Sequence, residues 1–318
     1  MGKQGKKIKM PKQPFVSVCM PTYNRRPFIP FILKSFESQT YPISKMELII
    51  IDDGTDLIED LVSHLPYVKY VKYNQKMTLG KKRNLSHEFA KGDVFVYMDD
   101  DDYYPPERVS HVVETLQQNP KVLCVGSSQM YIYFNEIKKM YQFGPYGPNH
   151  ATAATFGFRR ELLRKTCYLE TSCLSEEKHF LKNYTIPFAQ LDPRKTILVF
   201  AHGQNTFDKR DLIRTNSQFV HEVNDLPSDF IHNEETLHFF TNDIDQILYE
   251  YSAGQVINKP DVIEQTKELV SERQQMQKQI NEQNRQQQEY NELVNTIMNL
   301  HSNQQTSISL ISSQSSCS

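Results

Sequence analysis

The sequence of 318 residues predicts an α/β protein with a mostly parallel sheet and flanking helices, followed by a long helix and a disordered tail. Two observations predict the sheet: short apolar runs alternate with helical patterns from about residue 15, and acidic or polar turns follow several of the runs. A third observation predicts the separate end of the chain, because Gly and Pro are absent from Asp261 to Asn299. Strands that alternate with helices form parallel sheets covered on both faces, with right-handed crossovers.

The first part of the chain is expected to hold five buried strands, each an apolar run that ends in a turn: residues 15–20, 46–51, 67–71, 94–98 and 122–125. The first strand should end at Pro21, since proline has no N–H to donate to a neighbouring strand. Three helices are expected among these strands, at residues 28–36, 79–90 and 105–118. Thr78 is placed to cap the second helix, and Pro105 opens the third.

The alternation of strands and helices changes after residue 125. Residues 130–143 alternate like a hairpin, and the glycines and prolines of residues 144–149 predict a loop. Two short helices are then expected, at residues 158–164 and 174–181. The last strands of the core are expected at residues 186–191 and 196–200.

The chain is therefore expected to have five parts. After a basic, disordered arm at 1–13 come an α/β domain at 14–215, an extension of the core at 216–255, a long polar helix at 256–302 and a Ser/Gln-rich disordered tail at 303–318. Apolar residues recur along the long helix on a heptad frame, but polar residues hold several core positions: Thr266, Arg273, Gln283 and Gln287. This pattern favours at most a weak coiled coil, through which copies of the chain could form a homo-oligomer.

Composition argues against several classes of protein. A net charge of −2 gives no global attraction to nucleic acid, and the absence of an apolar window of ~18 residues argues against a transmembrane helix. No apolar segment follows the basic arm, so a secretory signal is not expected. The five cysteines are odd in number and lack the spacing of a metal knuckle: Cys19, Cys124, Cys167, Cys173 and Cys317. We therefore expect reduced thiols and a cytoplasmic location.

Four consecutive aspartates, Asp99 to Asp102, follow the expected strand at 94–98. Their mutual repulsion raises their pKa values unless a cation lies among them, and hard oxygen ligands suit Mg²⁺ or Mn²⁺. Such a cation could hold a diphosphate. The alternative is a solvated acidic turn, but ligands bind at the carboxyl ends of strands in open α/β sheets, so the position favours a cation site.

Two further turns are expected to reach the same edge of the sheet. In the first, Pro21-Thr22-Tyr23-Asn24 follows the first strand. In the second, Asp52-Asp53-Gly54 follows the second strand; a carboxylate there can accept from a base N–H or a ribose hydroxyl, or it can simply bond its own backbone. The start of the helix at Gly80-Lys81-Lys82-Arg83-Asn84 has free N–H groups and basic side chains that suit a phosphate. Together these turns predict one ligand-binding crevice.

These motifs resemble the family 2 inverting glycosyltransferases of the Rossmann-like GT-A fold. The resemblance covers residues 14 to about 205 and rests on five motifs in the right order: Val16-Ser17-Val18 with Pro21-Thr22-Tyr23-Asn24-Arg25, Ile51-Asp52-Asp53-Gly54, Gly80-x-x-Arg83-Asn84, Asp99-x-Asp101-Asp102, and Pro106-Glu107-Arg108. It implies a nucleoside-diphosphate-sugar donor, with a UDP-sugar expected, and an Mn²⁺ or Mg²⁺ cofactor.

The resemblance also implies roles for single residues. It sets the nucleotide base against Tyr23 and Asp53, with Pro21 and Thr22 lining the same turn. Arg83 would approach the base or the phosphates. Asp99 and Asp101 would be the outer aspartates of the DxD motif, with Asp101 the direct metal ligand, while Asp100 and Asp102 would contact ribose or sugar.

Two looser matches concern catalysis. Residues 151–157 are similar to the small-residue strand that borders the donor sugar in this family. Ser175-Glu176-Glu177 falls where the family has Glu-Asp, which makes Glu177 the expected base and Glu176 the alternative; the plainer interpretation is a glutamate stabilised by a helix N-terminus. His202 could be a third metal ligand, a phosphate donor or a structural histidine. In this scheme Glu177 takes the acceptor's proton during a single displacement that inverts the anomeric carbon.

Two other functions compete with sugar transfer. A nucleotidyltransferase would also use aspartates and Mg²⁺, but it usually has a Gly-rich, basic phosphate loop after its first strand, which Pro21 to Asn24 does not provide. An inactive scaffold acting through its C-terminal helix would have no use for the aspartate run, whose like charges only destabilise an empty protein.

The sequence names neither the sugar nor the acceptor, which could be a glycan, a protein or a lipid. The loop from Gln142 to His150 and residues beyond Phe207 are expected on the acceptor side. A composition rich in Tyr, Asn, Gln and Lys and without Trp indicates an AT-rich genome. The chain resembles glycosyltransferases of large DNA viruses, which would place it in a host cytoplasm or a virion.

Overall fold

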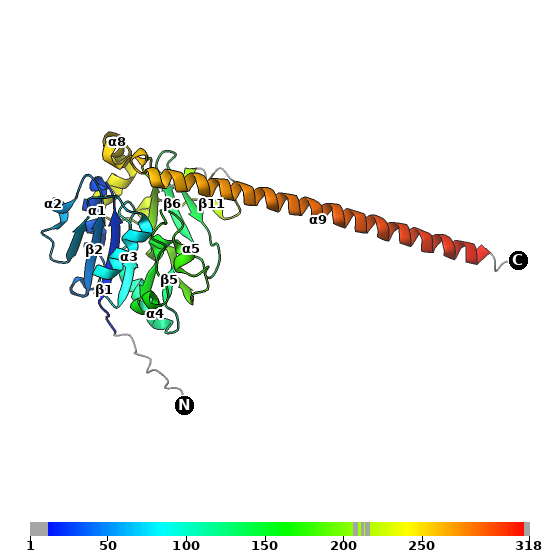
Figure 1. The fold of residues 1–318 in the computed structure, drawn as a ribbon, viewed down its shortest axis with the longest axis horizontal. Helices are drawn as coiled ribbons and strands as arrows, with labels where there is room; N and C mark the ends of the chain where they lie inside the picture. The colour runs from blue at the N-terminus through cyan, green and yellow to red at the C-terminus, as the bar shows by residue number, and fades with distance from the viewer. Residues whose placement is uncertain (1–11, 206–208, 211–212, 214–216, 315–318) are drawn as a thin grey trace, which may run out of the picture. The chain divides into compact units, whose positions relative to one another are not determined.

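A computed structural model describes residues 12–205, 209–210, 213 and 217–314 (Figure 1). The basic arm up to residue 11, Cys317 and part of the expected acceptor side after Phe207 lie outside the described residues. Contacts divide the chain into two units, residues 1–263 and residues 264–318. The sequence placed the start of the second part at residue 256, so the first unit extends eight residues further than expected.

The first unit is built on a seven-stranded, mostly parallel sheet, as the sequence predicted. The strand order is β3-β2-β1-β4-β8-β5-β9, and only β8 runs antiparallel to its neighbours. The strands span β1 Val16–Thr22, β2 Met46–Asp52, β3 Val68–Lys72, β4 Val94–Tyr97, β5 Cys124–Gly126, β8 Gly157–Arg159 and β9 Phe188–Gln190.

The expected end of the first strand at Pro21 is wrong. Strand β1 continues to Thr22, and Pro21 pairs in register with Ile51 of β2. Strand β1 pairs with β4 only as far as Cys19, so β1 has a single partner strand at Pro21. A residue that cannot donate a hydrogen bond is tolerated there, as it is on an edge strand.

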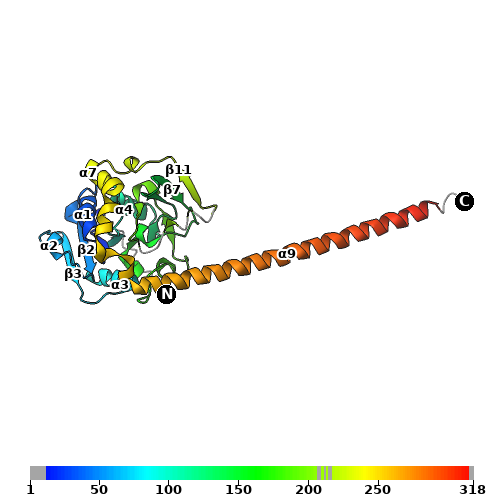
Figure 2. The same ribbon diagram turned by 90° about the horizontal axis from the view of Figure 1, so that it is seen from above.

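Helices cover both faces of the sheet (Figure 2). Helices α1 (Ile29–Glu37) and α4 (Arg108–Gln118) pack against the side of β1 that carries Val18, while α3 (Leu79–Phe89) packs against the side that carries Cys19. The hydroxyl of Thr78 accepts a hydrogen bond from the backbone N–H of Lys81, which confirms the predicted cap of α3. A short helix, α2 (Glu59–Val62), lies between β2 and β3.

Two of the short helices expected after residue 150 differ in the structure. Residues 157–159 form β8 and only 160–164 form a 3₁₀ turn, because Gly157 lies against Val112 with no room for a side chain and Phe158 stacks on Phe95 inside the sheet. The helix expected at 174–181 is reduced to α5 (Glu177–Phe180). Ser175 has a φ of +52°, which interrupts a right-handed helix before α5.

A second, four-stranded sheet has the order β10-β6-β7-β11. Its centre is the predicted hairpin of β6 (Met130–Phe134) and β7 (Lys139–Phe143). Strand β10 (Leu198–Ala201), expected in the main sheet, pairs instead with β6, and β11 (Val220–Val223) pairs with β7. The chain then forms α7 (Glu234–His238), a π-helical turn (Phe239–Asp243) and α8 (Ile244–Glu250), whose aromatic side chains pack on this sheet and on α1.

The last helix, α9 (Pro260–Gln314), begins in the first unit and forms most of the second. In its first turn Val262 is buried, whereas Met276, Tyr290 and Leu293 further along are exposed. The helix includes residues 303–314, where the sequence predicted disorder, since no Gly or Pro interrupts it; residues 315–318 lie outside the description. In the described part of the chain, none of the helices has the length and apolar character that a membrane span requires.

The boundary between the two units, after residue 263, gives a prediction about truncation. Removing residues 264–318 should leave the melting temperature of the first unit within about 2 °C of the full chain. Removing residues 256–318 also deletes buried Lys259 and Val262, and should cost about 2 kcal/mol, or roughly 4–8 °C. Thermal unfolding of both truncated chains checks this; equal melting temperatures would contradict the boundary at 263.

Candidate functional site

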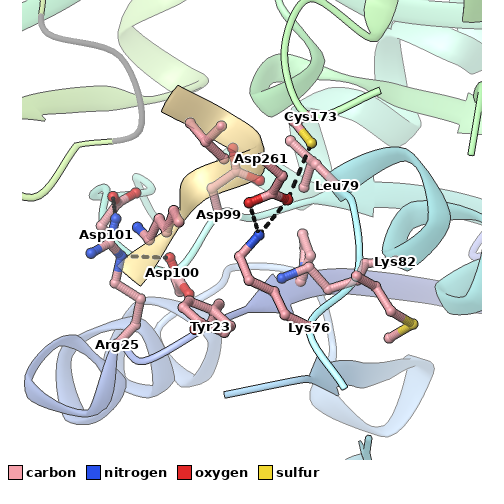
Figure 3. Close-up of a pocket in the computed structure, with 14 residues that line it drawn as sticks. Tyr23, Arg25, Lys76, Leu79, Lys82, Asp99, Asp100, Asp101, Cys173 and Asp261 are labelled. Atoms are coloured by element: carbon pink, nitrogen blue, oxygen red, sulfur yellow. Dashed lines mark hydrogen bonds and ion pairs between the residues drawn. The ribbon is translucent and has the colours of Figure 1, made fainter. Parts of the chain in front are cut away.

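The turns after β1 and β4 meet the loop before α3 around one pocket of about 120 Å³ (Figure 3). The pocket lies at the carboxyl edge of the main sheet, where ligands bind in open α/β folds. Its polar lining comes from four parts of the chain: Tyr23 and Arg25 after β1, Lys76 and Lys82 around the start of α3, Asp99 to Asp101 after β4, and Lys259 and Asp261 at the start of α9.

The aspartate run is held by arginines from two other elements. Arg25 lies 3.2 Å from Asp101 (Nη2 to Oδ2) and 3.7 Å from Asp100 (Nε to Oδ1), and Arg83 Nη2 of α3 lies 3.3 Å from Asp99 Oδ1. Burial raises the pKa of Asp100 to about 7. Burial acts the same way on Asp101, but the Arg25 guanidinium and the His202 ring outweigh it and hold the pKa of Asp101 below its usual range. The run therefore contains carboxylates of very different acidity.

The fourth aspartate has a different position. Asp102 Oδ1 accepts a hydrogen bond of 3.2 Å from the backbone N–H of Phe200 in β10, and it does not line the pocket. Burial raises the pKa of Asp102 well above its usual range. Asp102 thus links the main sheet to the second sheet, and its expected contact with ribose or sugar stays a prediction.

The residues expected to hold a metal are partly brought together. His202 Nε2 lies 3.4 Å from Asp101 Oδ2 and 2.9 Å from Asn205 Nδ2, and burial lowers the pKa of His202 to about 4. Its Nδ1 accepts from the Gln204 N–H, so a metal would have to displace one of these partners. No group of three His, Cys, Asp or Glu side chains among the described residues is close enough to hold a metal alone. Mg²⁺ and similar ions are often held by one or two carboxylates plus substrate phosphates and water, and this set of donors fits that pattern.

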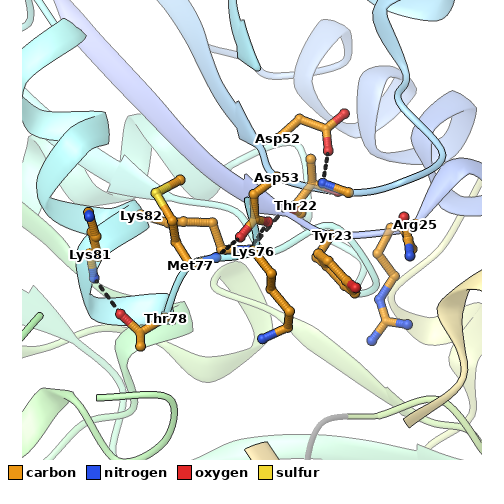
Figure 4. A network of polar contacts seen from close by, with 12 residues as sticks. Thr22, Tyr23, Arg25, Asp52, Asp53, Lys76, Met77, Thr78, Lys81 and Lys82 are labelled. Carbon is orange, nitrogen blue, oxygen red and sulfur yellow. Dashed lines mark hydrogen bonds and ion pairs between the residues drawn. The ribbon is translucent and has the colours of Figure 1, made fainter. Parts of the chain in front are cut away.

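The two aspartates after β2 have different surroundings (Figure 4). Asp52 accepts hydrogen bonds from the backbone N–H groups of Gly54 and Ile58 and from the Tyr70 hydroxyl, so it fixes the turn. Asp53 has a fully buried carboxylate that accepts from the Met77 N–H and, at 2.8 Å, from Lys82 Nζ. Asp53 is thereby joined to the pocket through Lys82.

Tyr23 and Lys76 form the part of the pocket where the base is expected. Lys76 Nζ lies 5.3 Å from the centre of the Tyr23 ring and pairs with the Asp261 carboxylate. The Tyr23 hydroxyl donates to the backbone carbonyl of Asn258 at 3.1 Å. Pro21 lines the same wall, and the buried Thr22 contributes its carbonyl as an acceptor for Lys82.

Arg83 connects the aspartate run to the candidate catalytic glutamates. Its guanidinium is buried, lies 4.4 Å from the Tyr97 ring centre and donates from Nε to Glu176 Oε1 at 2.9 Å. Its Nη1 has no hydrogen-bond partner within the described residues. Glu177 begins α5 and is half-buried outside the pocket lining. The structure therefore joins Glu176 to the aspartate run through Arg83 and leaves Glu177 beside that network.

Sequence reasoning missed three charged residues of the pocket: Lys76, Lys259 and Asp261. They lie in irregular segments or at a helix start, where no periodic pattern marks them. Lys82 belongs to the basic helix start that the sequence singled out, and Lys82 and Arg83 share one helix face because they follow Leu79 by three and four residues.

A second pocket of about 510 Å³ has His202 in its lining. Its described lining includes Phe134, Ala201 and Asp245. The loop from Gln142 to His150, expected on the acceptor side, contributes no described residue to either pocket. The acceptor assignment of that loop therefore stays a prediction.

The fold and the pocket are those of an α/β protein with a cavity at the carboxyl edge of a parallel sheet, where ligands bind in open α/β folds. Residues 17–175, half of the chain, match the family described as glycosyl transferase family 2, and the chain belongs to this family. Membership of this family argues against the nucleotidyltransferase that was the nearest enzyme alternative.

Two curated proteins and one solved structure illustrate the similarity. An uncharacterized glycosyltransferase of Haemophilus influenzae is 32% identical over 110 residues, which are 34% of this chain and 36% of that protein. The poly(ribitol-phosphate) β-N-acetylglucosaminyltransferase TarS of Staphylococcus aureus is 29% identical over 108 residues, 32% of this chain and 19% of TarS. The matched residues thus span little more than a third of the first relative and less than a fifth of TarS.

The solved structure is the mannosyltransferase PcManGT from Pyrobaculum calidifontis in complex with GDP-Man and Mn²⁺. It has a TM-score of 0.49 and 18% identity, with 74% of this chain and 71% of that chain covered.

The buried pair of Lys82 and Asp53 gives a prediction about stability. Lys82→Met removes the cation from a carboxylate that is fully buried, so it should lower the free energy of unfolding by about 3 kcal/mol. Lys81→Met, at the exposed neighbouring position, is the matched control and should change it by less than ~0.5 kcal/mol. Urea unfolding of both variants measures the difference; similar values would contradict the structural role of the pair.

Proposed function

We propose that this glycosyltransferase moves a sugar from a nucleoside-diphosphate sugar, most simply a UDP-sugar, to an acceptor hydroxyl with inversion of the anomeric carbon. The observation that carries the proposal is that the aspartate run after β4 and Tyr23 after β1 line one pocket in a chain of this family. The acidic run supplies cation ligands, and the aromatic ring supplies a surface for a base.

In this proposal the nucleotide base lies against Tyr23 and Asp53, in the turn formed with Pro21 and Thr22. The Asp53 carboxylate already accepts from Lys82 and Met77, but two carboxylate oxygens offer about four acceptor sites, so it can accept a base N–H as well. Asp99, Asp100 and Asp102 would contact the ribose or sugar. The buried, unpaired Nη1 of Arg83 would donate to the base or a phosphate.

The proposed metal ligands are Asp101 and Asp99, with His202 as the third. Mn²⁺ or Mg²⁺ bound there would offset the charge on the departing diphosphate. Support comes from the short separation of Asp101 and His202 and from the neutral ring that burial imposes on His202. Arg25 holds Asp101 ionised and ready for a cation.

We assign the base to Glu177 and a positioning role to Glu176. Glu176 is committed to Arg83 through a buried ion pair of 2.9 Å, so its loss would move the arginine beside Asp99. Glu177 is nearer to solvent, where an acceptor hydroxyl can approach. As the hydroxyl oxygen bonds to the anomeric carbon, its proton passes to Glu177, and the bond to the diphosphate breaks on the opposite face.

The experiment that tests the proposed function is a donor screen. Thermal shifts with UDP- and GDP-sugars in the presence of Mn²⁺ should show stabilisation by at least one donor, since a bound ligand stabilises the folded state. Release of the matching nucleoside diphosphate, with the configuration of the product read by NMR, tests transfer and inversion. Binding of no nucleotide sugar, or a product with retained configuration, would overturn the proposal.

Asp101→Asn provides a prediction about the metal. Because it removes the proposed direct ligand, it should reduce transfer by at least ~10²-fold and abolish the Mn²⁺-dependent part of UDP binding while the chain stays folded. Steady-state kinetics and UDP titration with and without EDTA measure both effects. Full activity of the variant, or of the unaltered protein in EDTA, argues against any metal role.

The base assignment gives a further prediction. Glu177→Gln should lower kcat by ~10²-fold or more with donor KM nearly unchanged, because a base acts mainly in the transition state. Glu176→Gln is the matched comparison and should mainly raise donor KM, since it releases Arg83. If Glu176→Gln instead causes the larger fall in kcat, the base is Glu176; if neither variant matters, the base lies elsewhere.

A further inference from the structure

One wall of the donor pocket comes from outside the residues that match the family. This C-terminal wall is residues 251–262. Asn24 Nδ2 donates to the Ala253 carbonyl at 2.9 Å, and Gln204 Nε2 donates to the Tyr251 carbonyl at 2.7 Å. The Tyr23 hydroxyl holds the wall as well, through Asn258. The wall is thus hydrogen-bonded to the turn after β1, where the proposed function puts the nucleotide base.

Gly254 fixes how closely this wall approaches. A Cβ atom added there would lie 2.1 Å from Gln204 Oε1 and 2.9 Å from the Asn24 carbonyl oxygen. A larger residue would push the wall away from the turn after β1. The close approach sets the following residues, including Lys259, at the pocket rather than on the surface.

Lys259 is the unusual member of the wall. Its side chain lines the pocket, and the residue is only 5% exposed. Among the described residues its ammonium has no hydrogen-bond acceptor and no ion pair within 4 Å, although Asp100 and Asp101 are near enough to attract it. Burying an ammonium without a partner is costly, and burial accordingly lowers the pKa of Lys259 to about 7. An anionic ligand in the pocket would stabilise the charged form.

The other cations of the pocket are already paired. Arg25 is bound by Asp100 and Asp101, Lys76 by Asp261, and Lys82 by Asp53. Among the described residues that line the pocket, Lys259 is therefore the basic side chain without an ion-pair partner. It lies on the side of Asp100 and Asp101, where the proposed function puts the diphosphate.

We propose that Lys259 binds the diphosphate of the nucleotide donor and of the nucleoside diphosphate product, as a positioning residue supplied by the C-terminal wall. This inference rests on the proposed function. An ammonium is a compact charge with three donors, suited to the oxygens of a phosphate. Lys259 and Asp99 to Asp101 line the same pocket, so a diphosphate bound beside the aspartates would lie within reach of the ammonium.

The test compares UDP with UMP, which lacks the second phosphate, by calorimetric titration with Mn²⁺. Lys259→Met keeps the apolar stem and should weaken UDP binding at least tenfold, while UMP binding changes less than threefold. Lys259→Arg keeps the charge and should retain most UDP affinity. Lys267→Met, at an exposed position of α9, is the matched control and should bind both nucleotides like the unaltered protein. If the unaltered protein prefers guanine nucleotides, the titrations use GDP and GMP in place of UDP and UMP.

The ratio of UDP to UMP affinity within one variant does not depend on how much of that variant is folded. If the wall only blocks the pocket, Lys259→Met will loosen it and tighten UDP binding, which overturns the inference alone. An unchanged UDP-to-UMP ratio overturns it too. If the unaltered protein binds no nucleoside diphosphate at all, the proposed function falls, and the role of Lys259 falls with it.

Discussion

Buried carboxylates that require buried cations are the constraint on which this site depends. Four acidic residues at the carboxyl edge of the main sheet are matched by a cation from another element: Asp101 by Arg25, Asp99 and Glu176 by Arg83, and Asp53 by Lys82. An unpaired charge in such surroundings would cost several kcal/mol, so these pairs fix the turns after β1, β2 and β4 relative to α3 and α5. The pocket is therefore preorganised by its own charges.

The main sheet could be predicted because its information is local. The apolar runs of β1, β2 and β4 are fully buried strands, and the Thr78 cap sits where its hydroxyl can reach a free N–H. Strand β8 could not be predicted in this way, since it is three residues long and exists because Gly157 and Phe158 fit between β4 and β5. The pairing of β10 with β6 likewise depends on a partner more than 60 residues away.

The site likewise contains residues with a local sequence signal and residues whose position depends on distant parts of the chain. Motifs that follow strands, such as Asp99 to Asp101 and Tyr23, were predictable because strand ends of a parallel sheet meet at one edge. The chemistry of the turn alone could not distinguish Asp52 from Asp53, and only the family resemblance singled out Asp53. Their surroundings differ because Asp52 is bonded to its own turn and to Tyr70. The sequence could not predict that Lys259 and Asp261 line the pocket, since no pattern near residue 260 indicates that the chain comes back to the turn after β1.

The C-terminal wall has a consequence for how the family domain is inherited and recombined. Residues 17–175 carry the recognisable motifs, but the pocket is discontinuous in the chain and closes only with residues about 80 positions later. A chimera that took only the matched segment from a relative would combine the relative's part of the pocket with the C-terminal wall of this chain. In the proposed function, donor preference therefore depends on both segments, and a change in the unmatched one can alter it while every family motif stays intact.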